Sequence, residues 1–406
     1  MKLRQYYEDI VLPLQECVCK MQLNGVLIDQ ERQKLLHTSC TNILEANQKI
    51  WTELLGYEFN PNSSQQCTAL YEKDLSIRLG GSADKLHLLK AVLHEPQLEH
   101  ITKAILNDRD LVKLRGTYLN ISPNIDGRLR SDWRAYGTVT WRLSSRDPDL
   151  QNLPQEGKQG INIKDIYVAP TGRILYSRDY SQLEYRIPAY ASGCRNLILL
   201  FSSGADIHLR NAKLVFGRET ITKKERYTSK TVKYAEGYGG GAETVSNQIL
   251  KKTYEYIDPK VIAHMMRIWR IEDKEMYDWL DQGYRDAVNN GVLFDGFGVP
   301  RHLYGRPDDR RGTGLAWPTA ATASGIMNRS MVRIHKRKIC EKFSAKLVMQ
   351  VHDELLFEVP DPVNPEFDKA IKEAMEEPVD IFGKKGIVFP TDVKVGYRYS
   401  ELKDLK

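Results

Sequence analysis

The chain has 406 residues, of which 41% are hydrophobic and 28% charged, and its formal net charge is +6. This composition fits a globular protein with room for several subdomains, and no stretch approaches the roughly 20 consecutive apolar residues that span a bilayer. The first residues lack the apolar core of a signal peptide, so we expect an intracellular protein. The six cysteines include no Cys-x-x-Cys pair, which argues against a zinc site or a disulfide framework.

The first 120 residues have the apolar spacing of helices. One helical run ends at Gly25, a second covers residues 30–55, and residues 84–119 are helical again. Between the last two, a turn leads into a short helix for which Ser63 or Ser64 is a suitable N-cap.

The pattern changes near residue 120, where glycines and prolines separate short segments with β character. Residues 173–179 predict a strand, residues 195–290 return to helix, and residues 346–359 form two apolar runs around a polar tip, the pattern of a β-hairpin. A helix at 364–377 and a last strand at 388–397 complete the chain.

Two carboxylates stand where these β segments end. Asp179 closes the predicted strand, and Asp353 lies at the tip of the hairpin. If the strands are neighbours, the carboxylates meet at one edge of the sheet, where their repulsion needs a cation to compensate it. Mg²⁺ prefers such oxygen ligands, and a pair of these ions about 4 Å apart catalyses phosphoryl transfer. Solvated acidic residues with no such role remain the alternative at this point.

A second pattern combines cations and aromatic rings. Arg226, Lys230, Tyr234 and Tyr238 are spaced four residues apart, so they project from one slanted face of a helix that Gly239–Gly241 would end. Such a face can bind phosphates at one end and stack on a base or sugar at the other. An amphipathic helix with a basic edge explains this pattern more simply when it is taken alone.

Three segments in one order resemble the polymerase motifs of A-family DNA polymerases, the group of bacterial DNA polymerase I and certain phage replicative enzymes. DYSQLEYR at 179–186 resembles motif A, the Arg226-to-Gly239 pattern resembles motif B, and VHDE at 351–354 resembles motif C. Further similar segments extend from about residue 10 to the C-terminus. They are residues 25–29, 60–63, 142–154, 206–208 and 392–396.

The resemblance implies an α+β right-hand fold, with both aspartates on an antiparallel palm sheet and motif B in helical fingers. The expected divisions are an N-terminal helix at 1–24, a thumb at 25–120, palm segments at 121–194 and 319–406, and fingers at 195–318.

It also implies a template-directed DNA polymerase that adds dNTPs to a primer 3′-hydroxyl by two-metal-ion phosphoryl transfer. The implied cofactors are two Mg²⁺ ions, for which Mn²⁺ can substitute, and the partners are primer–template DNA and dNTPs. We expect a monomer in the cytoplasm of a bacterial or phage-infected cell, with no membrane contact, no identifiable processivity partner and no exonuclease in this chain. A metal-dependent nuclease and a non-catalytic nucleic-acid-binding relative are the alternatives.

The resemblance assigns roles residue by residue. Asp179, Asp353 and the Tyr180 carbonyl hold the metal ions, Glu354 supports them, and Lys230 is the candidate proton donor to pyrophosphate. The implied dNTP-binding residues are His208, Arg226, Lys230, Tyr234 and Glu184, of which Glu184 blocks a ribose 2′-hydroxyl. The implied primer–template residues are Arg142, Gln151, Asn152, Tyr238, Gln350 and His352.

Two positions depart from the family pattern. Ala316 and Ala320 stand where the family usually has Asn and Gln near the primer–template junction, which puts mismatch sensing in doubt. Tyr234 stands where many members carry Phe, and this predicts efficient incorporation of dideoxynucleotides.

Overall fold

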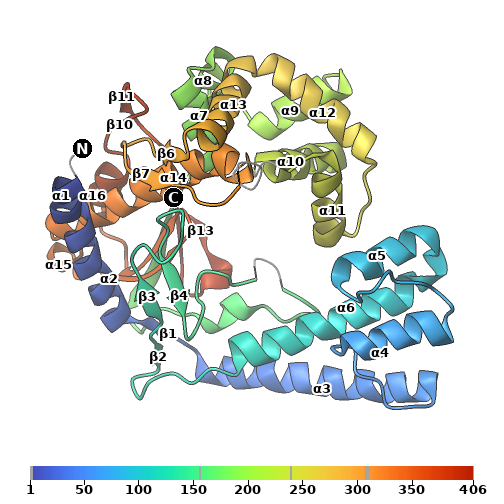
Figure 1. Ribbon diagram of the computed structural model, residues 1–406. Helices are drawn as coiled ribbons and strands as arrows, with labels where there is room; N and C mark the ends of the chain where they lie inside the picture. The colour runs from blue at the N-terminus through green and yellow to red at the C-terminus, as the bar shows by residue number, and fades with distance from the viewer. Residues whose placement is uncertain (1–2, 155–156, 238–239, 307–310, 406) are drawn as a thin grey trace.

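The computed structural model describes residues 3–154, 157–237, 240–306 and 311–405. It is a mixed α+β protein in which a five-stranded antiparallel sheet lies between two helical lobes (Figure 1). The strand order is β13–β12–β5–β9–β8. The strands are β5 (Arg173–Tyr180), β8 (Lys346–Val351), β9 (Glu354–Pro360), β12 (Thr391–Gly396) and β13 (Lys403–Asp404).

The predicted hairpin is confirmed, because β8 and β9 pair with Val351 opposite Glu354 and leave only His352 and Asp353 at the tip. Three helices share the core of the sheet: α2 (Leu12–Asn24), α14 (Arg311–Lys336) and α16 (Pro365–Met375). Helix α16 packs through Phe367, whose ring centroid lies 5.1 Å from that of Tyr176 on β5. This packing fixes the strands that carry the predicted site.

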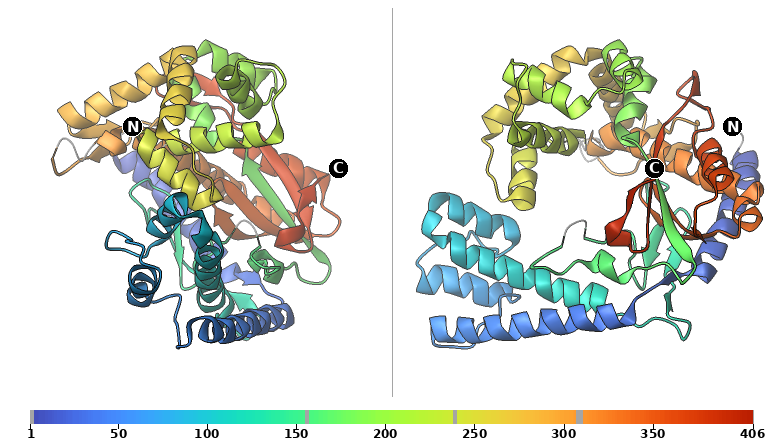
Figure 2. Two further views of the ribbon diagram at one scale, coloured as in Figure 1. Left: turned by 90° about the vertical axis from the view of Figure 1, so that its right-hand side faces the viewer. Right: turned by 180° about the vertical axis from the view of Figure 1, so that it is seen from behind.

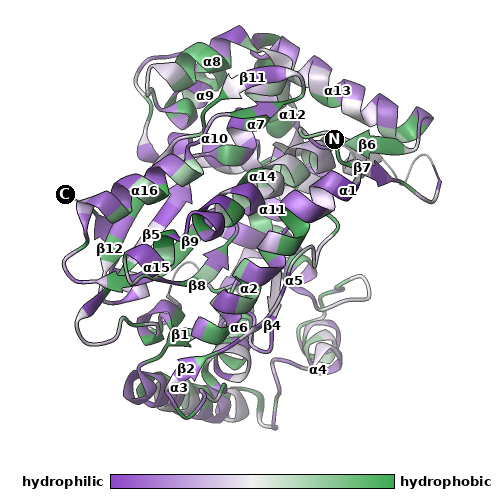
Figure 3. Cartoon of the chain, turned by 90° about the vertical axis from the view of Figure 1, so that its left-hand side faces the viewer, coloured by the Kyte–Doolittle hydropathy of each residue, from purple (hydrophilic) through white to green (hydrophobic). Residues whose placement is uncertain are grey.

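The first helical lobe follows β1 (Val26–Leu27) and has its own apolar core around Trp51 and Tyr71. Ser63 caps its second helix by accepting a hydrogen bond from the Gln66 N–H, so of the two predicted caps Ser63 is the one used. The long outer helix α3 mixes hydrophilic and hydrophobic residues along its length, as a helix with one buried face does (Figure 3). The lobe contains α3 (Gln30–Leu55), α4 (Ser64–Ala69), α5 (Lys85–His94) and α6 (Glu99–Lys113).

The second helical lobe lies across the sheet from the first, as the view from behind shows (Figure 2), and packs around the buried Trp269. The lobes meet at their tips, where Lys85 Nζ lies 4.4 Å from the centroid of the Tyr254 ring. Helices α13 and α14 cross closely, since a Cβ added at Gly283 would lie 2.8 Å from the Gly314 carbonyl oxygen. The helices of this lobe are α7 (Leu183–Ser192), α8 (Arg195–Ser202), α9 (Ile207–Phe216), α10 (Lys223–Gly237), α11 (Ala242–Thr253), α12 (Pro259–Glu272) and α13 (Lys274–Asn289).

The remaining α-helices and strands of the described chain are short. They are α1 (Leu3–Tyr6), β2 (Arg128–Leu129), β3 (Asp132–Arg134), β4 (Ser144–Arg146), β6 (Val292–Phe294), β7 (Pro300–His302), α15 (Ile339–Lys342), β10 (Val379–Ile381) and β11 (Lys384–Ile387). None of the described helices combines the length and the apolar character needed to cross a bilayer.

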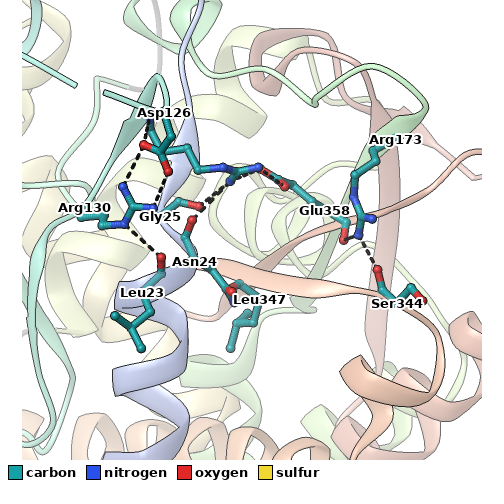
Figure 4. A network of polar contacts seen from close by, with 10 residues as sticks. Leu23, Asn24, Gly25, Asp126, Arg130, Arg173, Ser344, Leu347 and Glu358 are labelled. Carbon is teal, nitrogen blue, oxygen red and sulfur yellow. Dashed lines mark hydrogen bonds and ion pairs between the residues drawn. The ribbon is translucent and has the colours of Figure 1, made fainter. Parts of the chain in front are cut away.

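A polar network joins the first lobe to the sheet. Arg128 donates from both terminal nitrogens to the two carboxylate oxygens of Glu358, each at 2.8 Å, and Glu358 is fully buried. Around this pair Arg130 donates to the Leu23 carbonyl, and Asn24 donates to the Leu347 carbonyl (Figure 4). The ion pair therefore fixes β9 to the base of the first lobe.

One local prediction was wrong. The strand at the C-terminus is not the last, because β13 follows it and pairs with β12 through the polar residues Lys403 and Asp404. Helix α10 is described as far as Gly237 and Gly240 is no longer helical, while residues 238–239 of the predicted stop region lie outside the described residues. The predicted division between residues 318 and 319 falls inside α14, and the division itself stays a prediction.

Candidate active site

Asp179 and Asp353 lie at the same end of the central sheet. Asp179 is the penultimate residue of β5 and pairs in register with Glu354, the first residue of β9. The Tyr180 N–H donates to the Asp353 carbonyl at 3.0 Å, so the hairpin tip is fixed beside the end of β5. His352 takes φ = 55°, which turns the chain at the tip. The structure therefore brings the two predicted carboxylates together.

Burial and neighbouring carboxylates make both carboxyl groups costly to ionise. Burial and then Glu354, Asp353 and Asp392 raise the pKa of Asp179 to about 7, and burial followed by Glu184 raises the pKa of Asp353 to about 7. Asp179 is exposed to the adjoining cavity, but protein crowds it on its other sides. Within the described ranges, neither carboxylate forms an ion pair with a lysine or arginine. Their negative charge is available to a cation.

Glu354 is held beside this pair by two hydroxyl groups. Ser177 Oγ donates to Glu354 Oε1 at 2.6 Å, and the Tyr399 hydroxyl donates to Oε2 at 2.9 Å. On the other neighbouring strand Asp392 stands directly opposite Asp179. Sequence reasoning missed Tyr399 and Asp392 as part of the site, because only the pairing of β12 with β5 brings them there.

A cavity of about 930 Å³ opens in front of these groups, and it also reaches Tyr234 on α10. No cluster of three or more His, Cys, Asp or Glu side chains in the described part of the chain has the arrangement of a preformed metal site. Carboxylate and carbonyl oxygens beside open space nonetheless fit Mg²⁺, which keeps water ligands and takes others from substrate phosphates. Asp179, Asp353 and the Tyr180 carbonyl are the residues that fit.

The predicted basic and aromatic face of α10 is present as far as Tyr234. Lys230 Nζ lies 5.8 Å from the centroid of the Tyr234 ring, and the His208 ring from α9 lies 5.7 Å from it. Arg226 donates from Nε at 2.8 Å to Asp206, the N-cap of α9. Tyr238 lies outside the described residues.

The His208 ring is neutral near pH 7, because burial and then the neighbouring Lys230 lower the pKa of His208 to about 4. It can therefore donate or accept a hydrogen bond without adding charge beside the two cations of α10.

Several of the predicted primer–template residues lie on or beside the β8–β9 hairpin. Arg142 forms an ion pair with Glu184, the second residue of α7. Gln151 Nε2 donates to Gln350 Oε1 at 2.8 Å, and Gln350 in turn donates to the His352 carbonyl. These amides link residues that are far apart in the chain.

Asn152 is placed differently from these residues. It is exposed, and its side chain donates to Asp149 at 2.7 Å within its own turn. The Asn152 side chain is therefore bonded within its own turn and not to Gln151 or Gln350.

Comparison with known proteins identifies the family. The sequence profile of DNA polymerase family A matches residues 30–401. The chain is 30% identical to the thermostable DNA polymerase I of Thermus thermophilus over 97% of this chain and 48% of that protein. It is 28% identical to DNA polymerase I of Chloroflexus aurantiacus over 99% of this chain and 44% of that protein. It thus spans about half the length of these relatives.

A solved structure has the same fold. The POL domain of Pol1 from M. smegmatis, in complex with DNA primer-template and dNTP, matches with a TM-score of 0.86 and 24% sequence identity. The match covers 98% of this chain and 71% of that chain. The α+β fold is therefore that of a polymerase domain, and the chain belongs to DNA polymerase family A.

Proposed function

We propose that the chain is a template-directed DNA polymerase that adds dNTPs to a primer 3′-hydroxyl. The observation that carries the proposal is the meeting of Asp179 and Asp353, both with a pKa of about 7, at a cavity that also reaches α10. Carboxylates without an ion-pair partner suit divalent cations, and the cations of α10 suit a triphosphate. Family membership supports the same reaction.

In this proposal Asp179, Asp353 and the Tyr180 carbonyl hold two Mg²⁺ ions, or Mn²⁺ in their place, and Glu354 supports the two aspartates. When bound, the ions would supply activation of the primer 3′-hydroxyl and charge stabilisation for the departing pyrophosphate.

The residues of the second lobe bind the nucleotide in this proposal. Arg226, Lys230 and the neutral His208 bind the triphosphate, and Lys230 Nζ gives a proton to the pyrophosphate as it leaves. Tyr234 packs against the sugar, and Glu184 excludes a ribose 2′-hydroxyl. The dNTP therefore lies between α10 and the end of the sheet, which both line the cavity.

Primer–template DNA would lie between the lobes. A relative with the same fold is in complex with DNA primer-template and dNTP, which supports this kind of partner. We propose that Arg142, Gln151, Asn152, Gln350 and His352 contact primer–template, with Tyr238 at the template position. In these terms residues 25–120 act as the thumb, residues 195–318 as the fingers, and the sheet with its helices as the palm. Base pairing with the template, rather than these contacts, selects the nucleotide.

A primer-extension assay with Mg²⁺, dNTPs and a labelled primer tests the proposal against its two alternatives. A polymerase extends the primer, a metal-dependent nuclease shortens it, and a non-catalytic binding protein leaves it unchanged. We expect extension by the wild-type chain and none by Asp353→Asn, with DNA binding retained in the variant. Equal loss of binding and extension would indicate misfolding instead, and circular dichroism checks this.

Tyr234 gives the proposal a second test. Its ring lies beside His208 and Lys230 and lines the cavity, and in the proposal its hydroxyl group replaces the contact that a missing sugar 3′-hydroxyl would make. We therefore expect efficient ddNTP incorporation by the wild-type chain and strong discrimination by Tyr234→Phe. Discrimination that is strong in both proteins would refute this role of the hydroxyl group.

A further inference from the structure

The loop that carries Arg142 is attached to helix α14 by two hydrogen bonds. This loop, residues 135–143, joins β3 to β4. Trp317 Nε1 of α14 donates to the Val139 carbonyl at 2.7 Å, and Asn328 Nδ2 of α14 donates to the Trp141 carbonyl at 3.1 Å. Both bonds are to backbone atoms, so they fix the path of the loop rather than one side chain.

Aromatic packing reinforces this attachment. Trp317 is 2% exposed, and the Trp141 ring meets it edge-to-face with the ring centroids 6.1 Å apart. Trp141 has φ = 63°, a left-handed conformation that is costly for a bulky side chain and persists only where its surroundings enforce it. The contacts with α14 are the surroundings that do so.

The fixed path of the loop also fixes the position of Arg142. The Arg142 N–H donates to Thr138 Oγ1 at 3.1 Å, which closes the loop immediately before the arginine side chain. The guanidinium group then forms an ion pair with Glu184, and both side chains are only about a quarter exposed, at 28% and 26%. A continuous series of contacts therefore leads from Trp317 to the Glu184 carboxylate.

We propose that Trp317 is a positioning residue for sugar selection, acting on Glu184 through the Val139 carbonyl and Arg142 without touching the nucleotide. The inference rests on the proposed function, in which Glu184 occupies the space that a ribose 2′-hydroxyl would need. A carboxylate excludes a hydroxyl group only while it is held in place, since an unanchored glutamate can rotate away at little cost. Arg142 anchors it, and Trp317 anchors Arg142.

The test compares single-nucleotide insertion of a dNTP and of the matching rNTP by wild type and Trp317→Phe. Phenylalanine keeps an aromatic ring in the core but loses the donor to Val139 and part of the ring volume, a loss that the control below shares. We expect the ratio of kcat/KM for dNTP to kcat/KM for rNTP to fall about 5- to 10-fold. The fall should come mainly from a higher kcat/KM for rNTP, while kcat/KM for dNTP changes less than about 3-fold. Asn328→Ala, which loses the other hydrogen bond to the loop, should change the ratio in the same direction.

Trp269→Phe is the matched control. Trp269 is also fully buried, and its indole also donates to a backbone carbonyl, that of Asn211, at 3.1 Å within the second lobe. Trp269 belongs to the core of the second lobe and is not part of the series of contacts that leads from Trp317 to Glu184, so the sugar ratio should stay at the wild-type value even if stability falls. A fall in the ratio as large as that of Trp317→Phe would show a general effect of core damage and overturn the proposal.

Introducing Trp317→Phe into a Glu184→Ala variant tests whether Trp317 acts through Glu184. Sugar discrimination should already be lost there, and adding Trp317→Phe should change the ratio no further. A further fall, or an equal loss of dNTP and rNTP insertion in Trp317→Phe alone, contradicts the inference. If wild type extends no primer, the proposed function fails; if it extends and Trp317→Phe keeps the wild-type ratio, only this inference fails.

Discussion

The two ends of strand β9 differ in whether the protein itself neutralises the carboxylates that lie there. Near its C-terminal end Glu358 is fully buried and fully paired, with both oxygens bound by Arg128. At its N-terminal end Asp353, Glu354 and the neighbouring Asp179 lie together, and no described lysine or arginine forms an ion pair with them. One sheet thus contains a carboxylate neutralised by the protein and carboxylates left for a ligand to neutralise.

The difference separates stability from function. Loss of one partner from a buried ion pair leaves an uncompensated charge. Mutation at the paired end of β9 should therefore lower the free energy of unfolding. The other end carries repulsion that the metal-free protein tolerates, as catalytic sites commonly do. Substitution at the two ends should therefore affect different measurements.

Arg128→Met should have the largest effect on folding. It leaves Glu358 buried without its cation, which costs about 3–5 kcal/mol in the free energy of unfolding. Urea unfolding followed by circular dichroism measures this, and Arg130→Met, which alters a more exposed pair with Asp126, is the control with a cost below about 1 kcal/mol. If both variants lose the same small amount of unfolding free energy, the ion pair between Arg128 and Glu358 does not stabilise the fold in this way.

Asp353→Asn should instead stabilise the metal-free protein. A carboxyl group whose folded pKa is about 7 lies above its unfolded value of 3.8, so its ionisation lowers stability progressively as pH rises from about 4 to 7. Asparagine removes this penalty, and at pH 8 in EDTA we expect a gain of about 1–3 kcal/mol. The gain should shrink as the pH is lowered towards 4. A gain independent of pH, or a loss at pH 8, would show that burial and the neighbouring Glu184 do not penalise the ionised Asp353 in this way.

Tyr399→Phe should have the smallest effect. It removes one donor from Glu354 while Ser177 keeps the other, so the metal-site support is weakened rather than lost. We expect kcat for primer extension to fall about 3- to 10-fold, with stability changed by less than about 1.5 kcal/mol. Tyr397→Phe, which loses an exposed hydrogen bond to Asp361, is the matched control and should extend primers at the wild-type rate.

Local sequence patterns predicted the parts of this comparison that lie within one element. The strand ending at Asp179, the hairpin tip at Asp353 and the helical face from Arg226 to Tyr234 follow from periodicity and spacing alone. The antiparallel neighbourhood of β5 and β9, which the hypothesis of paired carboxylates required, is present in the structure.

The features that local sequence patterns did not predict depend on contacts between distant segments of the chain. Arg128 and Glu358 are 230 residues apart, and nothing near either residue predicts their pairing. Asp392 and Tyr399 join the site only through the pairing and turn after β12, and β13 consists of two polar residues without a strand pattern. Trp317 lies between Ala316 and Ala320 in the chain, but its hydrogen bond to Val139 depends on how α14 packs and no local pattern predicts it.

The most direct test of the central claim is Mn²⁺ binding followed by electron paramagnetic resonance. The protein is held with a dideoxy-terminated primer–template and the next dNTP, so that the phosphates complete the site without reaction. We predict that wild type binds Mn²⁺ and that Asp179→Asn and Asp353→Asn each weaken its affinity at least about 10-fold. Arg130→Met, distant from the site, should bind like wild type. Unchanged Mn²⁺ affinity in both aspartate variants would contradict the claim that these two carboxylates hold the catalytic cations.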